Sequence, residues 1–517
     1  MAYWKEEPLI SMEEKICKRL KQTGKLFVFL RQHRHHIMND GLINDLNDMY
    51  DDHPRGKPAV SPALLAMATL LQCYEQKSDA SAVLESVFDK RWQMVLGCLN
   101  KDEPPFSQGT LCDFRHRLIK HNMDKKLLER SVQVAKDYGG FCFKQLRVAL
   151  DSAPLQGAGR VEDTFNLVGH ALELVVESIG LITGNTAKKI RKLTGTQIIG
   201  KSSIKAALDI DWTDPNEKAN ALNILLKDVD KVHHWLKTQP KKLTQSSALR
   251  KSLKLLATVL EQNIEPDPNG GSRVKHEVAP NRLISINDQE MKHGRKSSSR
   301  TINGYKQHVA VELTSKLILA TCVRSANEPE FQASEYLKPG IQSWGEINEL
   351  QIDRGYLSSE LTKELYNSGQ RVVAKPWGQP NKGKFSKRDF NINLSLSQVT
   401  CPEGYTAKIQ GKKQQYVRFD ADSCHLCTQR TQCTESKTGR TLSIHEHEAM
   451  MIDLRQYTHT SKGRATARER VKVEHQLASI CNRKGPRARY IGKRNNEFDL
   501  NRTAAISNLH IAMALVA

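Results

Sequence analysis

The sequence predicts a mixed α/β fold in which helical segments surround and interrupt a sheet. Two segments, 146–152 and 349–353, alternate apolar and polar residues, as strands do, and each has an aspartate at its end or one residue before it. Long segments with helical spacing lie before the first strand and between the two. The two aspartates are far apart in the sequence, so they form one site only if both strands belong to the same sheet.

The N-terminal part, residues 1–140, is predicted to be a helical domain. Its segment 61–76 opens with Ser-Pro, a helix start signal, and carries apolar residues at helical spacing. The first predicted strand follows at 146–152, with Leu146, Val148 and Leu150 on one face and Asp151 on the other. The remainder, 141–517, is predicted to form a second domain.

Two insertions are expected inside this second domain. The first, 161–284, has a helical pattern to about residue 264 and then the breaker-rich linker 265–272. Paired strands are expected next at 305–313 and 316–324, joined by a two-residue Thr-Ser turn, with a short strand at 371–375. The second insertion, 381–461, is polar, basic and rich in cysteine.

The stretch from Asp353 to Tyr356 reads Asp-Arg-Gly-Tyr at the end of a predicted strand. The glycine permits a sharp turn, and Ser358, Ser359 and Glu360 are typical of a helix start. A structural alternative is an ordinary turn aspartate with no chemical role.

A third carboxylate is expected on a helix predicted at 464–481. Glu474 follows Arg470 by four residues, so both side chains project on one helical face. Considered alone, the pair would be interpreted as a solvated ion pair between residues i and i+4. Three converging carboxylates repel one another unless divalent cations bind between them, and carboxylate with water suits Mg²⁺ or Mn²⁺.

The chain is strongly basic, with a formal net charge of +21 and a pI near 9.4. This balance predicts a polyanionic partner, with DNA favoured over a role in solubility alone. We predict DNA contacts along the segment around the third acid and beside Asp353, from Arg354, Arg470, Arg483, Lys484, Arg487, Arg489, Lys493 and Arg494.

The cysteines fall into two groups. Seven are scattered, which is typical of reduced thiols in a cytosol, and no run reaches the roughly 18 apolar residues of a membrane helix. Four cluster around a predicted hairpin at 406–419 and could hold one structural Zn²⁺: Cys401, Cys424, Cys427 and Cys433. Ordinary reduced thiols are the alternative, and His425, His445 and His447 are alternative ligands.

The order of the predicted strands, acids and late helix along the chain resembles that in the DDE transposases of bacterial insertion sequences, in the insertion-sequence-four-like group. The features are strand-Asp151, paired strands with 304-GYKQHVAV-311, Asp353-Arg-Gly-Tyr, and Arg470-x-x-x-Glu474. The resemblance implies that 1–140 is a DNA-binding domain and that 141–517 is a catalytic domain. Its ribonuclease-H-like core is expected to place Asp151, Asp353 and Glu474 around two Mg²⁺ ions. Glu469 is the competitor for the third position.

The resemblance further implies DNA strand cleavage and strand transfer at the ends of a mobile element. The expected partners are double-stranded terminal inverted repeats and target DNA, bound by a homodimer in the bacterial cytoplasm at the nucleoid, with no membrane. Two other functions stay open: a nuclease of the same fold that does not join DNA, and a transposase-derived DNA-binding protein without catalysis.

Overall fold

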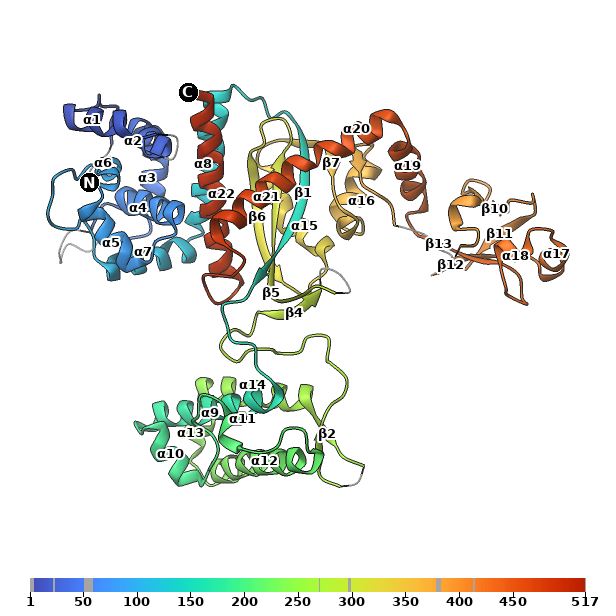
Figure 1. Cartoon of the computed structure of the whole chain (residues 1–517), viewed down its shortest axis with the longest axis horizontal. Helices are drawn as coiled ribbons and strands as arrows, with labels where there is room; N and C mark the ends of the chain where they lie inside the picture. The colour runs from blue at the N-terminus through green and yellow to red at the C-terminus, as the bar shows by residue number, and fades with distance from the viewer. Residues whose placement is uncertain are drawn as a thin grey trace.

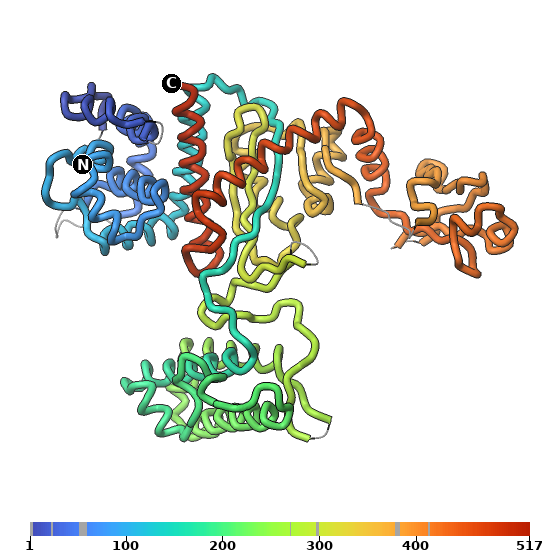
Figure 2. The backbone as a smooth tube through the Cα atoms, in the orientation of Figure 1, coloured from blue at the N-terminus to red at the C-terminus, as the bar shows by residue number. Residues whose placement is uncertain are grey.

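Three parts project from a central sheet in the computed structural model (Figures 1 and 2). N-terminal helices lie on one side of the sheet, a small cysteine-bearing sheet lies on the other, and a helical lobe hangs below (Figure 1). The structure describes residues 4–21, 24–50, 59–268, 270–295, 299–377, 383–411 and 414–516.

The N-terminal part is helical, as predicted. Helix α4 begins at Pro62 behind Ser61, at the expected start signal. The helices are α1 (Ser11–Arg19), α2 (Lys25–Ile37), α3 (Asp40–Asn47), α4 (Pro62–Glu75), α5 (Asp79–Phe88), α6 (Lys90–Leu96), α7 (Gln108–Lys120) and α8 (Met123–Gly139). Their apolar side chains belong to the same buried cluster as part of the central sheet, so the two share one core.

The central sheet is mixed and has the order β4-β5-β1-β7-β8, with β6 also paired to β5. Strands β1 and β5 are antiparallel, whereas β1, β7 and β8 run parallel. This arrangement confirms a ribonuclease-H-like core. The strands are β1 (Gln145–Gln156), β4 (Lys292–Arg295), β5 (Thr301–Glu312), β6 (Ile318–Ser325), β7 (Glu346–Gln351) and β8 (Arg371–Val373).

Two predictions about these strands were wrong in detail. Strand β1 does not end at Asp151 but continues to Gln156, because the segment 148–156 pairs with β5 along its whole length. The β5–β6 connection spans 313–317 rather than two residues. The carboxylate of Glu312 holds this longer turn by accepting hydrogen bonds from the backbone N–H groups of Thr314 and Ser315.

Each face of the sheet is covered by helices. Leu146, Val148 and Leu150 face α15 (Glu330–Gln342) and α16 (Glu360–Asn367), within the larger core. Ala149 lies on the opposite face, with residues of α21 (Val471–Lys484) and α22 (Lys493–Val516). The predicted alternation is confirmed, and it places Asp151 on the face covered by α21.

The late helix differs from its prediction. One helix was expected at 464–481, but the structure has α20 (Ser461–Glu469) and α21, which meet at Arg470. Neither glycine nor proline marks this break, so no residue in the sequence signals it. Helix α19 (Glu448–His459) precedes α20.

The first insertion is a helical lobe, as predicted, with its own apolar core. Its elements are α9 (Thr164–Thr183), α10 (Ala187–Thr194), α11 (Ile204–Leu208), α12 (Pro215–Lys237), α13 (Lys241–Thr244), α14 (Ser247–Asn263), β2 (Ile264–Pro266) and β3 (Ser272–Val274). Among the described residues, α9 is the one helix long and apolar enough to cross a membrane, but 61% of its apolar window is buried in the lobe. Helix α9 is therefore the central helix of this lobe.

The second insertion contains a five-stranded antiparallel sheet of order β13-β12-β11-β10-β9. The predicted hairpin at 406–419 is present as β11 and β12, although its residues 412 and 413 lie outside the described part of the chain. The elements are the 3₁₀ turn η3 (Lys387–Asp389), β9 (Asn391–Asn393), β10 (Gln398–Thr400), β11 (Thr406–Gln410), β12 (Gln415–Arg418), α17 (Ala421–Leu426), α18 (Arg430–Cys433) and β13 (Thr441–Ile444). Another 3₁₀ turn, η2 (Arg354–Tyr356), follows β7 in the central sheet.

Candidate active site

The two aspartates lie on neighbouring parallel strands. Ala149 of β1 is in register with Gln351 of β7, so Asp151 and Asp353 follow two residues later on each strand. Strand β7 ends at Gln351, and Asp353 begins the turn beyond it. Sequence reasoning could identify each aspartate, but their proximity comes from the strand order.

The Asp-Arg-Gly-Tyr stretch forms a 3₁₀ turn that Asp353 caps. The Asp353 Oδ1 atom accepts a hydrogen bond from the Arg354 backbone N–H at 2.8 Å. Tyr356 is fully buried, and its hydroxyl lies 2.6 Å from His308 Nδ1 on β5. This buried contact anchors the turn, while Asp353 and Arg354 remain exposed.

Gly355 is needed for space. A Cβ atom at this position would lie 2.1 Å from Oε2 of Glu330, which begins α15. The other oxygen of Glu330, Oε1, accepts a hydrogen bond from the Ser152 hydroxyl at 2.7 Å. The glycine thus allows the turn after β7 to approach a carboxylate that is also bonded to β1.

Arg470 connects the first and third predicted acids. Its Nη1 lies 3.3 Å from Asp151 Oδ2, and its Nη2 lies 2.7 Å from Glu474 Oε1. Because Arg470 occupies the joint between α20 and α21, Glu474 one turn later faces the same side of the sheet as Asp151.

These residues line one cleft with a volume of about 820 Å³. The cleft contains all three predicted acids, Asp151, Asp353 and Glu474. Its other lining residues include four with charged or hydroxyl side chains that were not predicted: Glu330, Arg295, Lys306 and Ser152. The sequence alone did not indicate that Glu330 and Arg295 belong to the site, because neither residue stands in a recognisable motif at the end of an apolar strand.

The electrostatics of Asp151 reflect this crowding. Burial raises the pKa of the Asp151 carboxyl above its ordinary value, and the negative charges of Glu474 and Asp353 raise it further. The Arg470 guanidinium and the Ser152 backbone N–H oppose the rise. An additional cation between the acids would therefore be favourable.

The competitor Glu469 lies elsewhere. Its Oε2 atom is 2.8 Å from Arg147 Nη2, and Arg147 also pairs with Glu349. Glu469 is not among the residues that line the cleft, whereas Glu474 is. This placement favours Glu474 as the third acid.

The donor set of the cleft suits a hard divalent cation, since it consists of carboxylates. Within the described ranges, however, no three His, Cys, Asp or Glu side chains are placed closely enough to hold a metal ion. In this arrangement the positive charge between Asp151 and Glu474 is the guanidinium of Arg470.

Most of the basic residues predicted to contact DNA have structural partners. Lys484 is the clearest correction: its side chain is 2% exposed and its Nζ lies 2.9 Å from the buried carboxylate of Asp499, so it is not accessible to DNA. Arg494 donates to Asp124 at 2.9 Å and joins α22 to α8. Lys493 lies 3.5 Å from Glu290 and from Glu328.

The remaining arginines differ in accessibility. Arg483 lies over the ring of Tyr74, 5.2 Å from its centroid, and Arg489 donates to the Lys77 carbonyl. Arg487 and Arg354 are exposed. These two, with Arg470 in the cleft, are the predicted basic residues best placed to meet a phosphate.

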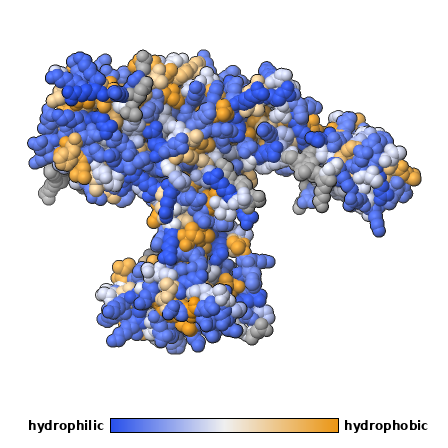
Figure 3. Space-filling view, viewed as in Figure 1, coloured by the Kyte–Doolittle hydropathy of each residue, from blue (hydrophilic) through white to orange (hydrophobic). Residues whose placement is uncertain are grey.

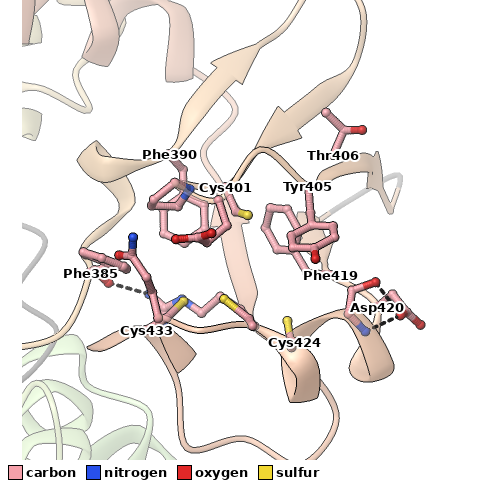
Figure 4. Close-up of a pocket in the computed structure, with 15 residues that line it drawn as sticks. Phe385, Phe390, Cys401, Tyr405, Thr406, Phe419, Asp420, Cys424 and Cys433 are labelled. Atoms are coloured by element: carbon pink, nitrogen blue, oxygen red, sulfur yellow. Dashed lines mark hydrogen bonds between the residues drawn. The ribbon is translucent and has the colours of Figure 1, made fainter. Parts of the chain in front are cut away.

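The four clustered cysteines line one small cavity of about 80 Å³ in the second insertion. Cys401 follows β10, Cys424 lies on α17 and Cys433 ends α18, and their sulfur atoms point toward a common space (Figure 4). Burial raises the pKa of the Cys433 thiol, and the other three thiols raise it further. The alternative ligands His425, His445 and His447 are not among the residues lining this cavity.

Two protein-family models match the chain, and both describe transposase domains. One, described as a transposase DDE domain, matches residues 400–511, which include Glu474 and the four clustered cysteines. The other, described as Transposase domain (DUF772), matches residues 15–117 in the N-terminal helices. No curated protein matches the chain.

Proposed function

Because the chain belongs to the insertion-sequence DDE transposases, we propose that it cleaves DNA at the ends of a mobile element and joins them to target DNA. The observation that carries this proposal is the shared cleft of Asp151, Asp353 and Glu474, beside Arg470. Membership in the insertion-sequence-four-like group stays a prediction.

Asp151, Asp353 and Glu474 are proposed to hold Mg²⁺ or Mn²⁺. The carboxylate chemistry of the cleft fits such an ion, and the raised pKa of Asp151 indicates uncompensated negative charge there. A bound divalent cation would lower the pKa of an attacking water and neutralise charge on the phosphate. Arg470 would exchange its carboxylate partners for a DNA phosphate when the ion binds.

Other side chains of the cleft are suited to hold the DNA backbone. Arg295 and Lys306 line the same cleft as the three acids, and exposed Arg354 follows Asp353 directly. A guanidinium can bind a phosphate through two parallel hydrogen bonds, which orients the scissile bond as well as attracting it.

The proposed reaction has two steps. In the first, water attacks the phosphorus at the element end, the P–O3′ bond breaks, and a free 3′-hydroxyl and a 5′-phosphate result. In the second, this 3′-hydroxyl attacks a phosphorus of the target, and the target's own 3′-oxygen leaves. Each step replaces one P–O bond by another, so no covalent bond to the protein is needed.

A structural Zn²⁺ is proposed for Cys401, Cys424, Cys427 and Cys433. The sheet of the second insertion has a small buried core of six residues, and small units of this kind commonly need a metal or a disulfide. Four thiols on one cavity match the ligand chemistry of Zn²⁺. Closer approach of the sulfur atoms than the structure shows would accompany binding.

The proposed partners are double-stranded terminal repeats and target DNA, with two copies of the chain acting together at the bacterial nucleoid in the cytoplasm. A single assay tests the proposed function. Purified protein, a labelled duplex from the element's flank and Mg²⁺ should give a nicked 3′ end that becomes joined to a second duplex. Cleavage without joining would favour the nuclease alternative, and neither activity would favour the DNA-binding protein without catalysis.

A further inference from the structure

The helical lobe segregates its charges along the sequence. Residues 178–208 contain six Lys and Arg and no Asp or Glu, and residues 231–260 contain seven and none. The acidic residues of the lobe all lie outside these two stretches, for example at Asp209, Asp228 and Glu261. Such segregation is unusual for a merely solvated surface, where both signs are interspersed.

The two acid-free stretches meet at one end of the lobe. The Thr164 hydroxyl at the start of α9 donates to Asn263 at the end of α14, so the two packed helices are antiparallel and the start of α14 lies near the end of α9. Lys231 Nζ donates to the carbonyl of Gly195, just after α10, at 3.0 Å. Helices α10 and α13 both lie at the end of the lobe farthest from β2 (Figure 1).

Most of these cations are exposed and lack an acidic partner. Among the described residues, Arg191 and Lys231 pair with Glu173 and Asp228. The others with exposed side chains and no ion pair within the described ranges are Lys188, Lys189, Lys192, Lys201, Lys237, Lys241, Lys242, Arg250, Lys251 and Lys254. Lys201 lies near the start of α9, since its backbone carbonyl is 3.2 Å from His170 Nε2. We call the other nine residues the basic end of the lobe.

The basic end contrasts with the basic segment near the third acid. There, Lys484 and Arg494 are tied to Asp499 and Asp124, whereas here the charges repel one another without local compensation. Binding of a polyanion relieves such repulsion, because the lysine and arginine side chains neutralise its phosphates and release the counterions condensed on its backbone. These cations are distributed over four helices, α10, α12, α13 and α14, and could therefore contact several phosphates at once.

We propose that the basic end of the lobe is a second DNA-binding surface, which holds duplex DNA outside the active-site cleft by its phosphate backbone. The space-filling view shows the lobe as a separate projection, so DNA can reach it without entering the cleft (Figure 3). Binding there is independent of base sequence, since lysine ammonium groups contact phosphates rather than base edges.

A second copy of the chain is the main rival occupant. Leu181, Ile182 and Leu193 are exposed in the same part of the lobe, and Leu181 is 86% exposed. Three apolar side chains form a small patch, and nine like charges around it would oppose the approach of an identical surface. The charge therefore favours DNA.

The test compares matched charge removals in the full-length protein. Arg250→Ala/Lys251→Ala removes two charges from the basic end, and Lys218→Ala/Lys227→Ala removes two exposed charges from α12, where acids are interspersed. Alanine preserves both helices. Binding of a duplex without element sequence is measured against salt concentration in EDTA.

The first variant should lower the log-log salt slope by roughly 1 to 2, at about 0.9 per lost phosphate contact, while the control variant leaves it unchanged. Lys188→Ala/Lys192→Ala should act like the first variant. Equal slopes for all proteins would overturn the proposal, as would a salt-insensitive dimer that Leu181→Ser dissociates. The proposal takes DNA as its partner from the proposed function, but the assay requires no cleavage, so the two can fail separately.

Discussion

Arg470 and Asp151 come from a helix joint and a central strand, yet their side chains lie 3.3 Å apart. The same guanidinium also binds Glu474, so one positive charge separates two of the three acids. The guanidinium of Arg470 therefore lies between the two carboxylates, where the proposed metal cation would otherwise bind.

Arg470→Gln should raise the affinity of the cleft for Mn²⁺ and weaken its affinity for DNA. Loss of one positive charge beside two carboxylates favours a divalent cation by about tenfold, or ~1.4 kcal/mol, while a phosphate contact disappears. Titration of Mn²⁺ followed by its paramagnetic signal measures the first effect, and Arg470→Lys is the charge-preserving control. Identical Mn²⁺ affinity in wild type and Arg470→Gln would show that Arg470 does not compete with the ion.

Gly355→Ala should disturb the cleft, although alanine can adopt the backbone conformation at this position. The new Cβ would meet Glu330 Oε2 at 2.1 Å, so Glu330 must leave its bond with Ser152. We expect a loss of about 1 to 3 kcal/mol in the free energy of unfolding and at least tenfold slower cleavage. Gly109→Ala is the matched control, since its Cβ would meet Ser107 Oγ at 3.8 Å. Equal stability of the two variants would place Glu330 elsewhere in solution.

His308 should make the core sensitive to acid. Burial, followed by the charges of Lys306 and Arg324, lowers the pKa of His308 from 6.5 to about 3. Below pH 6.5 the unfolded chain binds a proton that the folded chain excludes, so stability falls with pH until about pH 3. Between pH 6.5 and 5 this one group should remove about 2 kcal/mol.

Urea unfolding of wild type and His308→Gln at both pH values measures this contribution. The variant should lose less stability between them, because glutamine does not titrate. Equal losses in the two proteins would mean that His308 is protonated in the folded chain.

Substitution of Lys484 should affect the stability of the fold, and substitution of Arg487 should affect DNA binding. Lys484→Met leaves the buried carboxylate of Asp499 with Arg502 as its remaining partner in an ion pair, which should cost about 3 kcal/mol of stability. Arg487→Ala, at an exposed position, should change stability by less than about 0.5 kcal/mol.

Salt titrations of DNA binding complete the comparison. Arg487→Ala should lower the log-log slope by about 0.9, and folded Lys484→Met should not change it. The reverse result would return Lys484 to the DNA surface and remove Arg487 from it.

Local sequence patterns predicted the individual helices and strands better than the contacts between them. Alternation correctly assigned the faces of β1, because side chains of a strand alternate whatever lies beside it. The break at Arg470 was invisible, since it arises where α20 and α21 pack against the sheet and involves neither glycine nor proline. Strand order, which brings Asp151 next to Asp353, depends on contacts between distant segments.

Charge was the least informative signal for individual residues. Lys484 and Arg487 lie three positions apart in the same basic segment, but one is buried against Asp499 and the other is exposed. Composition cannot distinguish them, because the acidic partner lies on a different helix. For the same reason Glu330, which enters the cleft from α15, could not be assigned to the site before the fold was known.

The most direct measurement is strand cleavage and DNA binding by Asp353→Asn in Mg²⁺. Asparagine keeps the shape and the cap of the turn but removes a negative charge from the cleft, so stabilisation of the transition state should fall. We expect cleavage and joining to drop by roughly a thousandfold or more, which corresponds to about 4 kcal/mol. Binding of terminal DNA should be at least as strong as in wild type, because one charge that repels phosphate is absent. Near-normal cleavage by Asp353→Asn would contradict the catalytic assignment and leave Asp353 as the capping residue of a turn.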